Sequence, residues 1–422
     1  MIYNYFLEHN RYYNLLGILV VLLIAFIFSK NKSKIKPKLI ISALLLQFII
    51  GFIVLKTEIG KNSVDVVSSG ISRIYLFADE GIKFLFGNLA NAEMHWGFIF
   101  AFKILPIIIF FGALTAILSH FGIIQFFVSA INFIIRPILG TSGAETLCAV
   151  ANSFLGQTES PLLIRDYLST MTKSELFVVM VSGMATISGS ILAVFASMGV
   201  PAKHMLAASV MAIPASILIA KIILPETEES QTGKGVSLNL HSKSENIFDA
   251  IFKGTSDGLA LAVNVGAMLM VFISLIVLIN FLLGQGSIKV NEIFMYLGYN
   301  LNIPLLSLNY IFAQIFSPFA YLLGFSGHEA TAAAELLGTK VAINELVAYS
   351  KMVTMNLTER TQTILTYALC GFSNFSCIGI QVGGIGALVP EKRHWLTELG
   401  LLTVLASSLA NLLSALIAGI LL

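Results

Sequence analysis

The chain has 422 residues, of which 57% are hydrophobic and 11% are charged, and it carries a formal net charge of +2. An ordinary soluble domain has about 25% charged residues, so we expect lipid to surround most of this chain. The basic residues fall in short clusters between apolar runs, which excludes an extended nucleic-acid-binding surface.

Long apolar runs predict an all-α integral membrane protein. A transmembrane helix needs about 20 mostly apolar residues to cross roughly 30 Å of hydrocarbon. Eight runs meet this requirement, at residues 13–29, 38–55, 98–119, 174–199, 202–224, 258–283, 361–386 and 396–422. The first run is not followed by an Ala-x-Ala cleavage site, so we expect a retained span rather than a signal peptide.

The segment at residues 64–86, between the second and third spans, has a different pattern. Its apolar residues alternate at helical spacing with Asp65, Arg73, Asp79, Glu80 and Lys83. This pattern is typical of an amphipathic helix that lies in the membrane interface rather than crossing it.

The distribution of lysine and arginine predicts the orientation. Five lysines crowd the loop between the first two spans, at positions 30, 32, 34, 36 and 38. Because basic loops stay in the cytoplasm, this loop should be inside and the N-terminus outside a bacterial inner membrane. Eight crossings then place the 225–245 loop and the Lys392-Arg393 turn inside, and the C-terminus outside.

Two further apolar segments, residues 142–168 and 326–350, are too interrupted to span the membrane. The first splits at Gly156-Gln157-Thr158-Glu159, and the second is expected to turn at Gly338-Thr339-Lys340. Twelve helical residues reach only about 18 Å, so each segment predicts a re-entrant hairpin. Both hairpins open with Ser-Gly-x-Glu, at Ser142 and at Ser326, a pattern in which the serine caps the helix and the glutamate reaches back.

The two hairpins predict an internal repeat. Each follows an amphipathic stretch, residues 124–139 and 310–323, and an odd number of crossings separates them. They should therefore enter from opposite faces, which is the inverted-repeat plan of secondary transporters. A span interrupted by small and polar residues follows each hairpin, at residues 182–190 and 370–377. Close helix packing explains either interruption alone, whereas the matching positions favour unwound backbone that lines a binding site.

Glu159 and Glu345 are the two carboxylates that these spans place deepest in the membrane. Ionisable side chains at that depth are costly and mark functional sites, although an interfacial position is the alternative for either residue. Glu159 begins a new helix, whose free N–H groups favour an anion. Three other acids, Glu145, Glu175 and Glu329, are expected to be helix caps.

Four linked motifs resemble the concentrative nucleoside transporters, in the family's order, from about residue 98 to the end. They are Gly156-Gln157-Thr158-Glu159-Ser160-Pro161-Leu162, Ala185-Thr186-Ile187-Ser188-Gly189-Ser190, Asn344-Glu345-Leu346-Val347-Ala348-Tyr349, and Ala368-Leu369-Cys370-Gly371-Phe372-Ser373-Asn374-Phe375 continuing to Gly379–Gly384. The resemblance implies a homotrimer in membrane lipid. Each subunit would combine a scaffold, residues 1–140 and 225–325, with a transport domain, residues 141–224 and 326–422.

The resemblance also implies a nucleoside site and a sodium site. Gln157, Thr158 and Glu159 would face the base, Glu345 and Asn374 would hold the ribose hydroxyls, and Ile191, Phe372 and Cys377 would complete the substrate site. The sodium ion would lie at Asn152, Thr186, Ser190 and the carbonyls of Leu155 and Ile187. Cys377 stands where many members have serine, and a thiol is a weaker hydrogen-bond partner than a hydroxyl.

The expected function is therefore sodium-coupled import of nucleosides such as uridine, cytidine or adenosine by alternating access. Proton coupling, as in another branch of the family, is the first alternative. A membrane-embedded enzyme is a weaker one, because the chain lacks His-Glu-x-x-His, Gly-x-Ser-x-Gly and a phosphate-binding loop. A passive channel is the third alternative, and it would not accumulate substrate.

Overall fold

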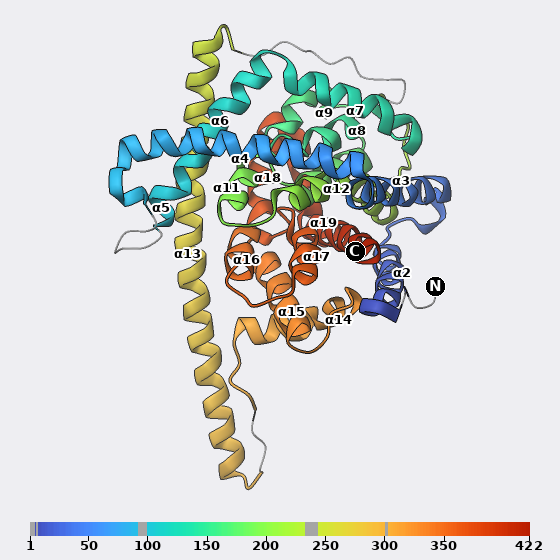
Figure 1. The fold of residues 1–422 in the computed structure, drawn as a ribbon. Coiled ribbons are helices and arrows are strands. Elements are labelled where there is room, and N and C mark those ends of the chain that lie inside the picture. Colours follow the sequence, from blue (N-terminus) through green and yellow to red (C-terminus); the bar gives the residue numbers. More distant parts are fainter. Residues whose placement is uncertain (1–4, 6, 92–98, 233–243, 300–302) are drawn as a thin grey trace.

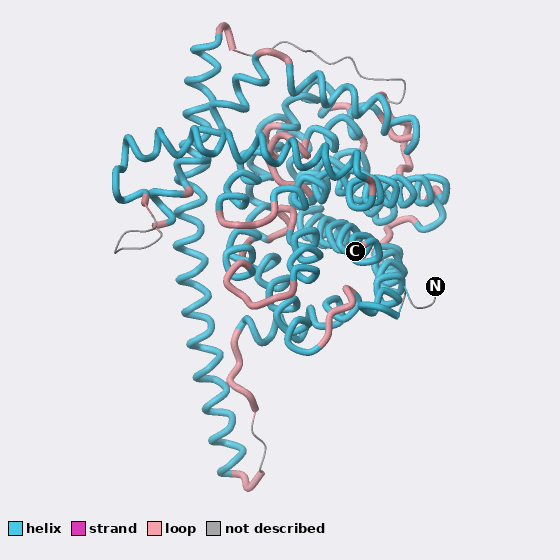
Figure 2. The backbone as a smooth tube through the Cα atoms, viewed as in Figure 1, coloured by secondary structure: helices cyan, strands magenta, loops and turns pink. Residues whose placement is uncertain are grey.

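The computed structural model describes residues 5, 7–91, 99–232, 244–299 and 303–422, and every regular element in these ranges is a helix (Figures 1 and 2). The all-α prediction is confirmed. Much of the 225–245 loop and the first residues of the chain lie outside the described residues.

Seven helices in the described part are long and apolar enough to cross a membrane, and they match seven of the eight predicted spans. They are α2 (Arg11–Ile27) with the short helix before it, α3 (Pro37–Lys56), α5 (Phe100–Lys103) with α6 (Leu105–His120), α10 (Lys173–Ala185) with α11 (Gly189–Ser197), α12 (Ala202–Ile223), α13 (Ile247–Tyr296), and α19 (Arg393–Leu421). The eighth predicted span, residues 361–386, forms two shorter helices, α17 (Glu359–Leu369) and α18 (Phe375–Leu388).

Helix α13 differs most from its prediction. The apolar run at residues 258–283 is only the middle of a 50-residue helix, which at 1.5 Å per residue is about 75 Å long. The helix runs along one side of the molecule and extends beyond the other helices (Figure 1). It packs closely on α6, where a Cβ atom built on Gly254 would lie 2.6 Å from the Cβ of Ala116. Polar residues near both ends of α13 interrupt the apolar run, so the hydropathy pattern predicts only the middle of the helix.

The predicted amphipathic elements are helices. Helix α4 (Glu58–Phe86) begins six residues before the predicted 64–86, and it runs at a steep angle to α13 in Figure 1. Helices α7 (Ile123–Leu139) and α14 (Leu308–Leu322) precede the two hairpin segments, as expected.

Both hairpin segments fold back on themselves. The first consists of α8 (Gly143–Ala151), the 3-10 helix η4 (Ser160–Ile164) and α9 (Arg165–Leu168), and the second of α15 (Gly327–Ala342) and α16 (Glu345–Met352). They lie toward opposite ends of the molecule in Figure 1, as an inverted repeat requires.

The predicted turn of the second hairpin at Gly338-Thr339-Lys340 is wrong. Helix α15 continues to Ala342, and the chain reverses at Ile343 and Asn344. Gly338 serves helix packing instead, because a Cβ atom there would lie 2.2 Å from the Cβ of Phe312 on α14. A Leu-Gly step marks a turn in the first hairpin and a close helix crossing in the second.

The predicted caps hold in two places of three. Glu145 accepts a hydrogen bond from the Ser142 N–H at 2.8 Å, and Glu175 accepts one from the Thr172 N–H at 2.8 Å. The cap predicted for Ser326 and Glu329 is wrong. Glu329 instead accepts hydrogen bonds from the Thr358 N–H at 2.9 Å and the Thr361 hydroxyl at 2.8 Å, which ties the second hairpin to the start of α17.

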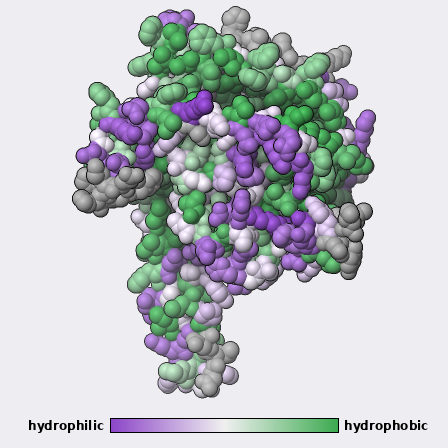
Figure 3. Space-filling view, viewed as in Figure 1, coloured by the Kyte–Doolittle hydropathy of each residue, from purple (hydrophilic) through white to green (hydrophobic). Residues whose placement is uncertain are grey.

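The core and the outer surface are both apolar. Helices α10, α12 and α19 pack against one another in the centre and are almost completely buried. Large apolar side chains are also exposed around the molecule, including Leu19, Phe84, Phe133 and Met270, and apolar residues cover broad areas of the face shown in Figure 3. Exposed apolar area on this scale is typical of a lipid-facing surface.

Candidate functional site

Two spans are broken near the centre of the molecule. The α-helix of α10 ends at Ala185, extended backbone follows at Thr186 and Ser188, and α11 begins at Gly189. Helices α17 and α18 are separated by residues 370–374. The interruptions predicted at residues 182–190 and 370–377 are therefore real breaks in helical backbone.

The breaks are joined by Asn411 of α19, a residue that the sequence reasoning missed. Its Nδ2 donates to the carbonyl oxygens of Ala185 and Cys370, each at 2.7 Å, so one amide satisfies the ends of both α10 and α17. The Ser373 hydroxyl donates to the Met184 carbonyl at 3.1 Å and to Asn411 Oδ1 at 2.9 Å. A polar residue in the middle of an apolar, almost completely buried span was the available signal.

Gly371 is required at the second break. Its φ of 151° lies in a region that favours glycine. A Cβ atom there would come within 2.6 Å of Asn411 Oδ1 and 2.8 Å of the Ala185 carbonyl oxygen. The absence of a side chain lets the two breaks approach.

Four of the predicted substrate residues form one chain of hydrogen bonds. Asn374 donates from Nδ2 to Glu345 Oε2 at 3.1 Å, and its Oδ1 accepts the Cys377 N–H at 3.0 Å. The Gln157 amide donates to Cys377 Sγ at 3.3 Å. All four residues are buried. The tip of the first hairpin and the second broken span thus meet at Cys377.

The other four predicted substrate residues lie around this chain. Thr158 approaches Gly384 of α18, where a Cβ atom would lie 3.0 Å from Thr158 Cγ2. Glu159 is exposed and accepts the Gly156 N–H at 3.4 Å. Ile191 is buried in the first turn of α11, and the half-buried Phe372 packs against Met184, Cys377 and Val404.

The predicted sodium ligands come from the first hairpin tip and the first break, which are in direct contact. The Gly189 N–H donates to the Phe154 carbonyl at 3.1 Å, and Asn152 Nδ2 donates to the Ser182 hydroxyl at 3.0 Å. These contacts bring Asn152 and Leu155 toward the predicted ligands of the first break, Thr186, Ile187 and Ser190.

The side-chain oxygens fit a hard cation. Asn152 Oδ1 is buried and has no hydrogen-bond partner among the described residues, and Thr186 and Ser190 supply hydroxyls at the break between α10 and α11. Amide, hydroxyl and carbonyl oxygens are the ligands that such an ion prefers. A bound sodium ion would satisfy Asn152 Oδ1.

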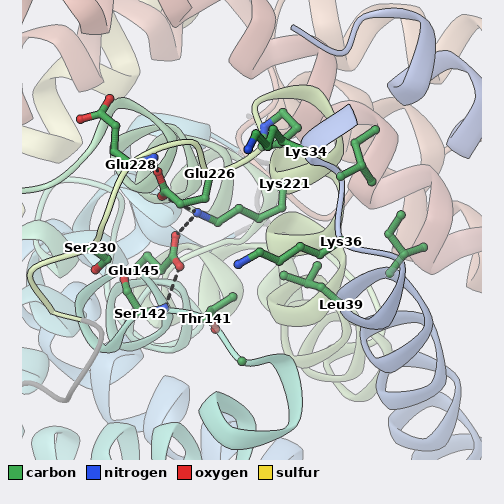
Figure 4. A pocket seen from close by; sticks show the side chains of 14 residues that line it. Lys34, Lys36, Leu39, Thr141, Ser142, Glu145, Lys221, Glu226, Glu228 and Ser230 are labelled. Atoms are coloured by element: carbon green, nitrogen blue, oxygen red, sulfur yellow. Dashed lines mark hydrogen bonds and ion pairs between the residues drawn. The ribbon is translucent and has the colours of Figure 1, made fainter. Parts of the chain in front are cut away.

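A separate pocket of about 200 Å³ lies beside the start of the first hairpin (Figure 4). Lys221 of α12 forms ion pairs there with Glu145 of α8 at 2.7 Å and with Glu226 at 3.3 Å. None of the predicted substrate or sodium residues lines this pocket. The ion pairs attach the first hairpin to α12.

Three family models match the chain. They are the Na+ dependent nucleoside transporter N-terminus at residues 16–89, Nucleoside recognition at residues 101–202, and the Na+ dependent nucleoside transporter C-terminus at residues 204–419. The nucleoside permease NupC of Helicobacter pylori is 39% identical, over 97% of both chains. Sodium/nucleoside cotransporter 1 of Rattus norvegicus is 34% identical, over 96% of this chain and 63% of that protein.

Solved structures agree with the sequence matches. CNTnw in an inward-facing substrate-bound state has a TM-score of 0.88 and 38% identity, covering 97% of this chain and 98% of that one. A CNTnw variant in an outward-facing state has a TM-score of 0.89 and 37% identity, covering 97% of each chain. These proteins are nucleoside transporters, which sets aside the membrane-enzyme alternative, and the chain belongs to the concentrative nucleoside transporter family.

Proposed function

We propose that this nucleoside transporter is a sodium-coupled symporter that imports nucleosides by alternating access. One observation carries the proposal: the tip of the first hairpin holds both the unpartnered Asn152 Oδ1 and, five residues later, Gln157 of the buried hydrogen-bond chain. An ion that orders this tip would also position the substrate residues on it.

The nucleoside would bind along the chain of hydrogen bonds. Glu345 and Asn374 would hold the ribose hydroxyls, because a carboxylate accepts two neighbouring hydroxyl donors. Gln157, Thr158 and Glu159 would face the base, with Ile191 and Phe372 packing beside it. Cys377 lies between these two sets and already accepts the Gln157 amide, so its sulfur would help to hold the base-facing residue.

The sodium ion would bind Asn152, Thr186, Ser190 and the carbonyl oxygens of Leu155 and Ile187. Neutral oxygen ligands leave the charge of the ion uncompensated, so its binding energy depends on the geometry of the tip and the break. Substrate binding would fix the same hairpin tip and would therefore strengthen sodium binding.

For the whole protein, we propose a homotrimer in a bacterial inner membrane with both termini in the periplasm. Residues 1–140 and 225–325 would form the scaffold, and residues 141–224 and 326–422 the transport domain. Helix α13 would offer a surface for the trimer contact, because the apolar part of the helix that could cross the membrane is not buried within one chain and exposes Val263, Val277 and Leu282.

Uptake into proteoliposomes tests the coupling. The purified protein would be reconstituted and supplied with radiolabelled uridine or adenosine, under an inward sodium gradient, an inward proton gradient or neither, with potassium replacing sodium at constant ionic strength. We expect accumulation above the external concentration only with the sodium gradient. Accumulation driven by protons alone would establish the proton-coupled alternative. Equilibration without accumulation under either gradient would indicate a channel.

A further inference from the structure

Lys340 is a buried lysine that the nucleoside and sodium sites do not use. It lies in the last turn of α15 and is 2% exposed. Its Nζ donates to the Ala368 carbonyl at 2.9 Å and to Asn411 Oδ1 at 2.7 Å. Among the described residues no carboxylate lies within ion-pairing distance, 4.0 Å, of this nitrogen, in contrast to Lys221 with Glu145. A buried charge is costly, so its contacts need an explanation.

Lys340 contacts the end of α17 directly, and its second partner, Asn411, joins the two breaks. Ala368 is in the final turn of α17, where carbonyl groups have no partner within the helix and the helix dipole is negative. The carbonyl oxygen of Cys370, at the same end of α17, accepts a hydrogen bond from Asn411 Nδ2. Lys340 therefore places positive charge at the interrupted end of a helix.

The first break has a similar arrangement, but no charged side chain of the described residues hydrogen-bonds the carbonyls at the end of α10. The Ala185 and Met184 carbonyls at the end of α10 accept from the neutral groups of Asn411 and Ser373. The first hairpin supplies Asn152, whose buried Oδ1 has no partner in the described part of the chain. The second hairpin thus contributes the amino group of Lys340 to its break, whereas the first hairpin contributes an amide oxygen, Asn152 Oδ1, that has no partner among the described residues.

We propose that Lys340 is a tethered cation that does at the second break what the sodium ion does at the first. The inference rests on the proposed sodium site. It follows that one sodium ion accompanies each nucleoside, since the second half carries its own positive charge. Lys340 is a positioning residue: it fixes the last turn of α15, five residues before Glu345, and through Asn411 it connects the two breaks.

The wild-type stoichiometry is the first test and needs no variant to fold. Simultaneous uptake of ²²Na+ and [³H]uridine by proteoliposomes, with the membrane potential clamped, gives the number of ions per nucleoside. We expect a ratio of about one, because only one of two otherwise corresponding breaks lacks a built-in cation. A ratio of two or more would overturn the tethered-cation proposal but leave sodium coupling intact. Uridine uptake without any sodium flux would instead remove the proposed function.

Lys340→Met tests the charge itself, because it keeps an unbranched side chain and exposes the oxygens that Lys340 contacts. Uridine binding would be titrated at increasing sodium and constant ionic strength. We expect affinity at least about 10-fold weaker at moderate sodium, recovering as sodium rises, with the Hill coefficient increasing from about one toward two as a second ion replaces the ammonium group.

The matched control is Lys351→Met in the same hairpin, where Lys351 forms a partly exposed ion pair with Glu335 at 3.0 Å. This control should leave affinity and Hill coefficient within about twofold of wild type. Unchanged uridine affinity in Lys340→Met, or weakened affinity with an unchanged Hill coefficient, would overturn the proposal. If the Lys340→Met variant does not fold, the number of sodium ions transported per uridine by the wild-type protein tests the proposal.

Discussion

Glu345 is the residue on which the account of sugar recognition depends. Its carboxylate is buried, and the partner that the structure shows, Asn374 Nδ2, occupies one oxygen at 3.1 Å. The remaining acceptor positions are available for ribose hydroxyls. Hydrogen bonds of this charge-assisted kind contribute about 1.5–3 kcal/mol each.

Glu345→Gln should therefore weaken uridine binding by roughly 10- to 100-fold and remove most of the discrimination against deoxynucleosides. The variant keeps the shape of the side chain but loses the charge and one acceptor. Competition of uridine, 2′-deoxyuridine and 3′-deoxyuridine against labelled uridine measures both effects. Wild-type affinity, or full hydroxyl selectivity, would show that Glu345 is structural and that the sugar binds elsewhere.

Asn152 should control the sodium dependence. Because Asn152→Ala removes the unpartnered oxygen, we expect the sodium concentration for half-maximal uridine uptake to rise by about 10-fold, as for the loss of one ligand bond of about 1.4 kcal/mol. Uridine affinity at saturating sodium should change much less. Uptake of uridine measured across a sodium series provides the result, and a variant with wild-type sodium dependence would remove Asn152 from the ion site.

Gly371 tests the contact between the two breaks. Gly371→Ala would place a methyl group 2.6 Å from Asn411 Oδ1, at a φ of 151° that other residues rarely adopt. We expect uridine transport to fall below about 10% of wild type through a strain of about 1–3 kcal/mol. Gly379→Ala, at a helical position on α18 with open space around it, is the control and should transport normally. Equal activity of the two variants would contradict this role of Gly371.

At the scale of elements, α4 is attached to the third span through Asp79. Lys83 contacts Asp79 at 3.0 Å, and Lys103 of α5 forms a shorter hydrogen bond to it. Burial acts to raise the pKa of Asp79, but the hydrogen bonds and positive charges of the two lysines outweigh it, so the pKa is lowered.

Asp79→Asn should destabilise the protein by about 1–2 kcal/mol at neutral pH, because it removes the charge from these bonds. An acid with a lowered pKa in the folded state stabilises the fold above its ordinary pKa, and this contribution is lost as the pH falls through the folded value. Thermal unfolding in detergent from neutral to acidic pH would measure the difference. The gap between wild type and variant should close in acid, and a gap independent of pH would contradict the electrostatic explanation.

The sequence predicts most elements and fewer of their contacts. Hydropathy locates the spans because lipid requires apolar helices of fixed length, and the small polar runs locate both breaks. It does not distinguish a glycine that turns the chain from one that lets a helix approach, which is why Gly338 is misplaced. Nor does it pair Glu329 with Thr358 or Asn411 with two distant carbonyls, since these partners depend on tertiary packing.

At the scale of the molecule, the two halves pack together through the buried helices α10, α12 and α19, and buried hydrogen bonds join them near the breaks. Asn411 binds the ends of α10 and α17, and Cys377 receives the amide of Gln157 from the first hairpin. Because these hydrogen bonds are buried, breaking them would be costly, and this favours movement of the two halves as one body. This supports the proposed transport domain, in which the ion at one break and the nucleoside at the other are carried together.

Cooperative binding of sodium and nucleoside at this junction is what links the ion site to the substrate site. The direct measurement is an equilibrium titration of uridine at zero and saturating sodium, together with the reciprocal titration of sodium at zero and saturating uridine. Each ligand should tighten the other by the same factor, about 5- to 150-fold for a coupling of 1–3 kcal/mol. Titrations in which neither ligand changes the affinity of the other would contradict the account.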